Sequence, residues 1–184
     1  MKKKVLLHIC CAPCSASAVK MLRDGYDIFF YWYNPNIYSE QEYKNRKESS
    51  VKYAEELNVL FYEERDFFYN YGSWKNKSSE KCNLCYILRL EKTAMFAQQN
   101  KFDFFSTSLL SSPYQKHDLI KQTADNFAYK YMIKFLYDDF RTCFYESKNS
   151  LRQKGYYMQK YCGCNKSLNE RLKVKKVCRS DTAQ

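Results

Sequence analysis

Two hydrophobic patterns alternate along the first three quarters of the chain. Short runs of apolar, branched and aromatic residues predict buried strands; between them apolar residues recur every three or four positions, which predicts amphipathic helices. The predicted strands span residues 5–9, 27–33, 59–62, 102–107 and 132–136. The predicted helices span residues 15–24, 39–57, 81–99 and 117–131, and the polar residues 71–79 predict a loop.

This alternation of strands and helices predicts an α/β fold. Right-handed helical crossovers make neighbouring strands parallel, so we expect a mainly parallel sheet flanked by helices, the layering of nucleotide-hydrolase and HUP-like proteins. Later in the chain the pattern weakens to a helix over residues 140–160, broken at Gly155, and a last helix over residues 169–177. We therefore expect one domain of 184 residues, with an α/β core over about 1–137 and a helical, cysteine-containing extension over about 138–184.

Composition indicates a packed protein with a polyanionic partner. Hydrophobic residues make up 45% of the chain, and three prolines and four glycines exclude collagen-like and low-complexity classes. Lysine and arginine outnumber aspartate and glutamate by 31 − 20 = 11, and 18% of residues are aromatic. A basic, aromatic-rich surface suits unstacked nucleic-acid bases. The alternative is that the aromatics fill the core and the charge only keeps the protein in solution.

The amino terminus does not match a targeting segment. The apolar run at residues 5–7 is interrupted by His8, whereas a secretory signal needs about 7–15 apolar residues. No stretch approaches the roughly 20 apolar residues of a membrane span. We expect a cytoplasmic protein with no membrane partner, in which cysteines stay reduced and close pairs favour metal or redox chemistry.

Cysteine is the unusual residue, with nine copies against two histidines. Seven of the nine form three tight groups, which are Cys10, Cys11 and Cys14, then Cys82 and Cys85, then Cys162 and Cys164. Cys82 and Cys85 stand three residues apart at the start of a predicted helix, which places both thiols on one face where the helix dipole favours thiolates. Cys143 and Cys178 stand apart and are interpreted as ordinary thiols.

Three kinds of chemistry fit these cysteines. Zinc ribbons and fingers are local, whereas residues 15–81 separate the first group from the second. Thioredoxin-like chemistry needs one CxxC motif and leaves the other thiols unexplained. Thiolates gathered from distant elements suit an iron–sulfur site, and Cys10 and Cys11 directly follow a predicted strand, at the sheet edge where parallel α/β folds bind ligands. A non-catalytic, zinc-stabilised RNA-binding module stays open as the alternative.

Several motifs occur together in one order. They are LHICCAPCS at residues 7–15, YNPNI at 33–37, CNLCY at 82–86, SPYQKH at 112–117, DFR at 139–141 and YCGC at 161–164. With these motifs the chain resembles the cobalamin-independent epoxyqueuosine reductase family (QueH) over residues 5–167. It departs from the family pattern at Lys81, Ser39 and residues 108–111, and none of these departures removes a cysteine.

The resemblance implies an oxidoreductase of queuosine biosynthesis. Its substrate would be epoxyqueuosine at the wobble position of a tRNA anticodon loop, and a two-electron deoxygenation would turn the epoxide into an alkene. The family carries a [4Fe–4S] cluster and an adjacent iron ion. We expect Cys10, Cys11, Cys82 and Cys85 to surround the cluster and Cys14 to bind the adjacent iron, although spacing leaves the division of these five sulfurs open. Cys162 and Cys164 are possible additional ligands.

The predicted catalytic residues are Tyr114, His117 and Arg141. The reaction needs a proton, for which Tyr114, His117, Tyr161 and a bound water are candidates. Arg141 and Lys116 are candidates for stabilising phosphate or developing charge. The structural alternatives are that His117 only begins a helix and that Arg141 only pairs with a neighbouring aspartate.

The partners implied are the tRNA and an unidentified electron donor. The tRNA backbone would balance the charge of +11. Tyr33 and Trp74 are candidates for stacking on an unstacked base. Tyr43 and Arg46, three apart on a predicted helix, are candidate motif residues that could equally lie on the surface.

Overall fold

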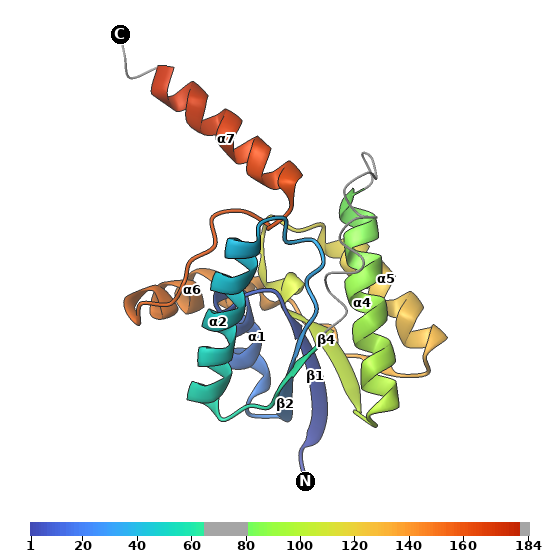
Figure 1. The fold of residues 1–184 in the computed structure, drawn as a ribbon. Helices are drawn as coiled ribbons and strands as arrows, with labels where there is room; N and C mark the ends of the chain where they lie inside the picture. The colour runs from blue at the N-terminus through green and yellow to red at the C-terminus, as the bar shows by residue number, and fades with distance from the viewer. Residues whose placement is uncertain (65–80, 181–184) are drawn as a thin grey trace.

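The computed structural model describes residues 1–64 and 81–180, so the predicted loop at 71–79 and Trp74 lie outside the described residues. Five parallel strands form one sheet in the order β3-β2-β1-β4-β5 (Figure 1). The strands are β1 (Lys3–Ile9), β2 (Tyr26–Trp32), β3 (Phe61–Glu63), β4 (Phe104–Thr107) and β5 (Lys134–Phe135). All five predicted strands and the parallel α/β fold are confirmed.

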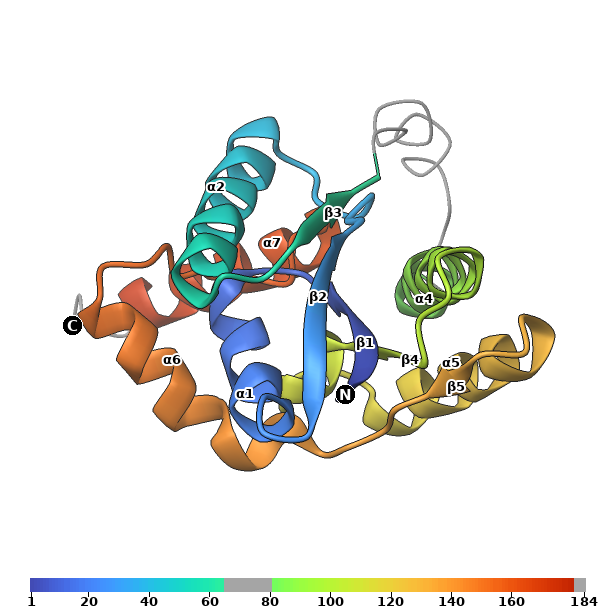
Figure 2. The same cartoon turned by 90° about the horizontal axis from the view of Figure 1, so that it is seen from below.

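Helices cover both faces of the sheet. The described helices are α1 (Ala12–Leu22), α2 (Glu40–Leu57), α4 (Lys81–Gln99), α5 (His117–Lys130), α6 (Phe144–Gln153) and α7 (Asn165–Ser180). The last of them, α7, projects away from the sheet (Figure 1). Figure 2 shows α1, α2 and α6 on one side of the sheet and α4 and α5 on the other. Among the described helices, none is both long and apolar enough to cross a membrane.

The central strand β1 is buried along most of its length. Residues Val5, Leu6, Leu7 and Ile9 are fully buried, because helices cover both faces of the strand. This explains why residues 5–9 are apolar except for His8 instead of alternating between apolar and polar. Burying each such side chain stabilises the fold by about 1.5–3 kcal/mol.

The first helix begins earlier than its apolar pattern predicts. It starts at Ala12 instead of residue 15, and Pro13 lies in its first turn, where a missing N–H leaves no helical hydrogen bond unmade. Cys11 is the extended N-cap residue, and its carbonyl accepts a 2.7 Å hydrogen bond from Ser15 Oγ. The helix therefore begins directly after Cys11, which places Cys14 about one helical turn from Cys11.

The carboxyl-terminal part differs from the prediction. The helix expected over 140–160 is instead the 3₁₀ turn η2 (Phe140–Cys143) followed by α6, and α7 begins four residues before the predicted position. Gly155 has φ +75° and follows the end of α6. Beyond it, Tyr156 and Tyr157 donate hydrogen bonds of 2.6 and 2.5 Å to Glu56 and Glu42 of α2. These tertiary contacts hold residues 156–164, here called the cysteine strap, out of helical geometry.

Candidate metal centre

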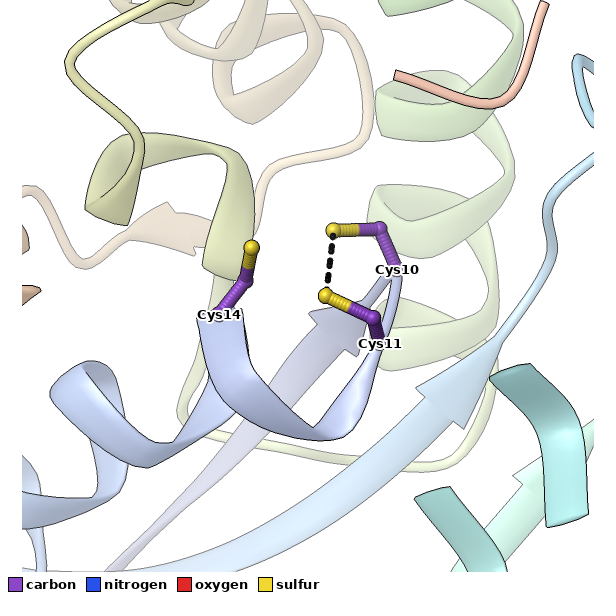
Figure 3. Close-up of side chains that lie close together, drawn as sticks. All are labelled: Cys10, Cys11 and Cys14. Carbon is purple, nitrogen blue, oxygen red and sulfur yellow. Dashed lines mark hydrogen bonds between the residues drawn. The ribbon is translucent and has the colours of Figure 1, made fainter. Parts of the chain in front are cut away.

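Three thiols gather at the carboxyl end of β1. Cys10 follows the strand, Cys11 caps α1, and Cys14 lies in the first turn of that helix. Their sulfur atoms all lie within 4.8 Å of one another, and the Cys10 and Cys11 sulfurs are 3.8 Å apart (Figure 3). Among the described residues, these three cysteines form a group that could hold a metal ion, and all of its ligand atoms are sulfurs.

The three thiols differ in their protonation. Hydrogen bonds from the Cys11 and Cys14 thiols hold the pKa of Cys10 well below its ordinary value, against the opposing effect of burial. Burial raises the pKa of Cys11, and donation to Cys10 raises that of Cys14. Cys10 is therefore the one thiol of the three whose pKa its neighbours lower overall. A metal ion would replace their protons, because metal-bound cysteines are deprotonated.

The other two cysteine groups lie around the same region. Burial, opposed by the Arg89 charge, raises the pKa of Cys85 on α4 to about 12, and nearby Cys162 and Cys164 contribute to the rise. Cys162 Sγ accepts a hydrogen bond from Gln115 Nε2 at 3.5 Å, and Cys164 Sγ lies 3.4 Å from Ser167 Oγ. Cys82 is half-buried at the start of α4. The strap thiols thus lie near Cys85 of α4, and a site shared by all three cysteine groups stays a prediction.

A pocket of about 390 Å³ opens between these elements. The groups that line it include Cys10, Cys14, Cys162, Arg46, Arg89, Ser108, Ser112, Tyr114, Gln115, Lys148, Gln159, Lys160, Tyr161 and Glu170. Gln159 Nε2 donates to Cys14 Sγ at 3.2 Å. The pocket therefore joins sulfur ligands, amide donors and positive charge in one space.

Arg46 anchors the cysteine strap from α2. Arg46 is 2% exposed, which excludes the surface alternative for this residue. Arg46 Nε donates to Glu42 Oε1 at 2.7 Å, and the two Nη atoms donate to the carbonyls of Tyr161 at 2.8 Å and Cys162 at 3.1 Å. Tyr43, by contrast, is half-buried and accepts a 2.7 Å hydrogen bond from Trp32 Nε1.

Arg89 and His8 form a second buried polar group. Arg89 Nε donates to His8 Nε2 at 3.3 Å, Nη2 to Asn34 Oδ1 at 2.8 Å, and Nη1 to Cys85 Sγ at 3.6 Å. Burial, and then the Arg89 charge, lowers the pKa of His8 to about 3, so the ring is neutral. The sequence motifs assigned neither residue a role in the site. The available signals were a histidine inside a buried strand and an arginine one helical turn after Cys85.

The predicted catalytic residues occupy different places. Tyr114 lines the pocket and is 80% exposed. His117 is buried, and its Nε2 lies 2.9 Å from the Leu110 carbonyl and 3.8 Å from Asp139 Oδ1. Arg141 is exposed and donates twice to Asp139, at 2.6 and 2.7 Å. His117 and Arg141 are not among the residues that line the pocket.

Replacing Gly163 with alanine should destabilise the strap. Gly163 has φ +114°, and a Cβ there would lie 3.1 Å from Ile37 Cγ1 and 3.3 Å from Arg46 Nη1. We expect Gly163→Ala to lower the free energy of unfolding by about 1–3 kcal/mol in urea titrations. The matched control is Gly25→Ala, where a Cβ meets nothing within 4 Å and φ is not positive. Equal stability of the two variants would contradict the tight packing of Gly163.

Comparisons with known proteins decide the family. The sequence profile described as "Epoxyqueuosine reductase QueH" matches residues 5–170. The chain belongs to the epoxyqueuosine reductase QueH family. The resemblance inferred from the motifs and the oxidoreductase assignment are therefore confirmed, and the zinc-stabilised RNA-binding alternative is not favoured.

Individual relatives support this assignment. The chain is 34% identical to epoxyqueuosine reductase QueH of Dehalococcoides mccartyi, over 94% of this chain and 96% of the relative. It is also 34% identical to the QueH of Thermotoga maritima, over 91% of each chain. Among solved structures, the U34-tRNA thiolase NcsA from Methanococcus maripaludis with its [4Fe-4S] cluster matches with a TM-score of 0.53 at 12% identity. That match covers 86% of this chain and 58% of the thiolase, and it shows a shared fold only.

Proposed function

We propose that this QueH-family chain reduces epoxyqueuosine in the anticodon loop of tRNA to queuosine. The observation that best supports this function is the pocket at the carboxyl edge of the sheet, which Cys10, Cys14 and Cys162 line. The chain that forms it belongs to this family. The reaction adds two electrons and two protons to the epoxide, breaks its two C–O bonds, and releases the oxygen as water with formation of a C=C bond. The electrons come from an external donor.

The cysteines fit an iron–sulfur centre by their donor chemistry. Soft thiolate ligands suit iron–sulfur clusters. The group formed by Cys10, Cys11 and Cys14 offers only sulfur ligands, with no carboxylate or imidazole among them. With Cys82 and Cys85 of α4, they would hold a [4Fe–4S] cluster and an adjacent iron ion, and the strap's Cys162 and Cys164 are further candidate ligands. When bound, such a centre supplies single electrons and a Lewis acid for the epoxide oxygen.

The chain's own residues would position the substrate and supply a proton. Tyr114 and Tyr161 line the pocket and carry hydroxyl groups that can donate a proton to the epoxide oxygen. His117 acts from behind the pocket, because it contacts the Leu110 carbonyl in the 3₁₀ turn η1 (Ser108–Ser111), and the first residues of η1 line the pocket. Arg141 donates to Asp139 and so would keep this carboxylate next to His117, behind the η1 residues that line the pocket.

Metal and sulfide analysis tests the centre directly. Protein purified without oxygen should contain about four acid-labile sulfides and four to five irons per chain, as a cluster with one adjacent iron requires. Loading should also raise Tm, because the metal centre binds the folded chain and not the unfolded one. About one zinc per chain with no sulfide would contradict the proposed mechanism.

Binding of tRNA should weaken steeply with salt. Lys148 and Lys160 line the pocket, and α7 starts at its rim with Lys166 and Arg171. We propose that these cations contact phosphates around the anticodon loop. The plot of log affinity against log salt concentration should have a negative slope, and Lys160→Met should make it shallower by about 0.7–0.9.

The matched control for this titration is Lys101→Met. Lys101 is exposed and follows the carboxyl end of α4, whereas Cys82 and Cys85 lie at its amino end. The control should therefore leave the slope unchanged. An unchanged slope in Lys160→Met as well would exclude the pocket rim as the phosphate-binding surface.

A further inference from the structure

Arg89 is a buried cation whose neighbours carry no negative carboxylate. The residue is 1% exposed and lines the metal-centre pocket from α4. Its side chain donates hydrogen bonds to three groups, which are a ring nitrogen of His8, the amide oxygen of Asn34 and the sulfur of Cys85. Within residues 1–64 and 81–180, no aspartate or glutamate forms an ion pair with it.

The other buried arginine that lines the pocket, Arg46, has the carboxylate partner that Arg89 lacks among the described residues. Arg46 is also almost fully buried, but Glu42 Oε1 lies 2.7 Å from its Nε and balances the charge. Burying a guanidinium without an anion is strongly unfavourable, whereas pairing it with an anion offsets that penalty. A negative charge on the Cys85 sulfur, 3.6 Å from Arg89 Nη1, would therefore balance the buried guanidinium. That charge exists when Cys85 binds a metal, because metal-bound cysteines are thiolates.

We propose that Arg89 is a positioning residue that serves as the fixed counter-charge of the thiolate-bound metal centre, favouring its assembly and its reduced state. The inference deepens the proposed function and rests on it, since it requires a metal centre on these cysteines. Two consequences follow. Metal loading introduces thiolate charge that Arg89 stabilises, and reduction adds one more negative charge that the same guanidinium stabilises.

Three variants separate the charge of Arg89 from its packing. Arg89→Met removes the charge and keeps a long side chain, and Arg89→Lys keeps the charge but loses the planar fork of donors. The matched control is Lys92→Met, which removes a cation one turn further along α4. Lys92 is about one-third exposed and pairs with Glu64 at 3.9 Å, away from the sulfurs.

Two measurements distinguish the effect of the Arg89 charge on the metal centre from an effect of Arg89 on folding alone. The first is the rise in Tm on metal loading, compared between apo and loaded forms of each variant. Hydrogen bonds lost to His8 and Asn34 affect both forms and cancel in this difference. The second is the midpoint potential of the loaded protein, followed by electron paramagnetic resonance during a redox titration.

We expect Arg89→Met to show a smaller loading-induced rise in Tm than wild type. Its midpoint potential should fall by at least ~59 mV, which corresponds to a tenfold change in the equilibrium constant of a one-electron reduction. Arg89→Lys should fall by less, and Lys92→Met should match wild type.

Equal potentials and equal loading responses in Arg89→Met and wild type would overturn the proposal. If Arg89→Met fails to fold, Arg89→Gln, which keeps an amide donor, takes its place. Failure of both neutral variants to fold without metal would show that the guanidinium serves the fold itself, and would also overturn it. A wild-type protein without iron and sulfide would instead overturn the proposed function, and this inference with it, so the two failures are distinguishable.

Discussion

Replacing Cys10 with serine should abolish epoxide reduction in a chain that remains folded. Cys10 is the thiol with the lowered pKa, it lies within 4.8 Å of Cys11 and Cys14, and it lines the pocket. A serine oxygen is a hard ligand that replaces soft thiolate poorly on iron. We expect turnover to fall by about 10³-fold or more, which corresponds to about 4 kcal/mol in transition-state free energy. Iron content and turnover are measured on the same sample.

The matched control for this variant is Cys143→Ser. Cys143 is half-buried at the start of α6 and does not line the pocket. It should keep its iron and its turnover within about twofold of wild type, since surface changes away from a site have small effects. Circular dichroism should show the same helix content in both variants. Full iron content and full turnover in Cys10→Ser would contradict the assignment of Cys10 as a ligand.

Replacing Arg46 with methionine should produce the largest loss of stability. The change leaves Glu42, which is nearly buried, without its cation, and leaves the carbonyls of Tyr161 and Cys162 without donors. Breaking a buried ion pair in this way costs about 3–5 kcal/mol of unfolding free energy. The strap that carries Cys162 should also detach, so iron content should fall together with stability. Urea unfolding followed by circular dichroism measures the first effect.

Two further variants isolate the ion pair. The double variant Glu42→Gln/Arg46→Met removes the unpaired charge and should recover part of the lost stability. Lys44→Met, on the same helix, removes an exposed cation 3.9 Å from Glu48 and should change stability by less than about 0.5 kcal/mol. An Arg46→Met chain as stable as Lys44→Met would show that the strap is held by other contacts.

The strands and the first cysteine group were predictable because their signals are local. Residues 5–9 are apolar except for His8, since β1 is buried on both faces, and Cys10 follows this segment directly. Parallel topology then places Cys10 at the edge where ligands bind. The apolar periodicity of residues 81–99 likewise predicted α4, and it placed Cys82 and Cys85 at the start of that helix.

The charged wall of the pocket was not predictable from local pattern. Arg46 lies on a helix whose other residues are mostly polar, so its periodicity gives no indication that the strap covers it. Arg89 is buried by contacts to β1 and to the turn after β2, which are far away in the sequence. The strap departs from helical geometry because Tyr156 and Tyr157 bond to α2, a preference that arises only in the folded chain.

Conversion of the modified nucleoside tests the central claim most directly. Anaerobically purified protein with its iron and sulfide is mixed with tRNA that carries epoxyqueuosine and a one-electron reductant. The tRNA is then digested, and the nucleosides are identified by mass spectrometry. We predict a product lighter by one oxygen atom, formed by wild-type protein and not by Cys10→Ser. Unchanged epoxyqueuosine after incubation with fully loaded wild-type protein would contradict the proposed function.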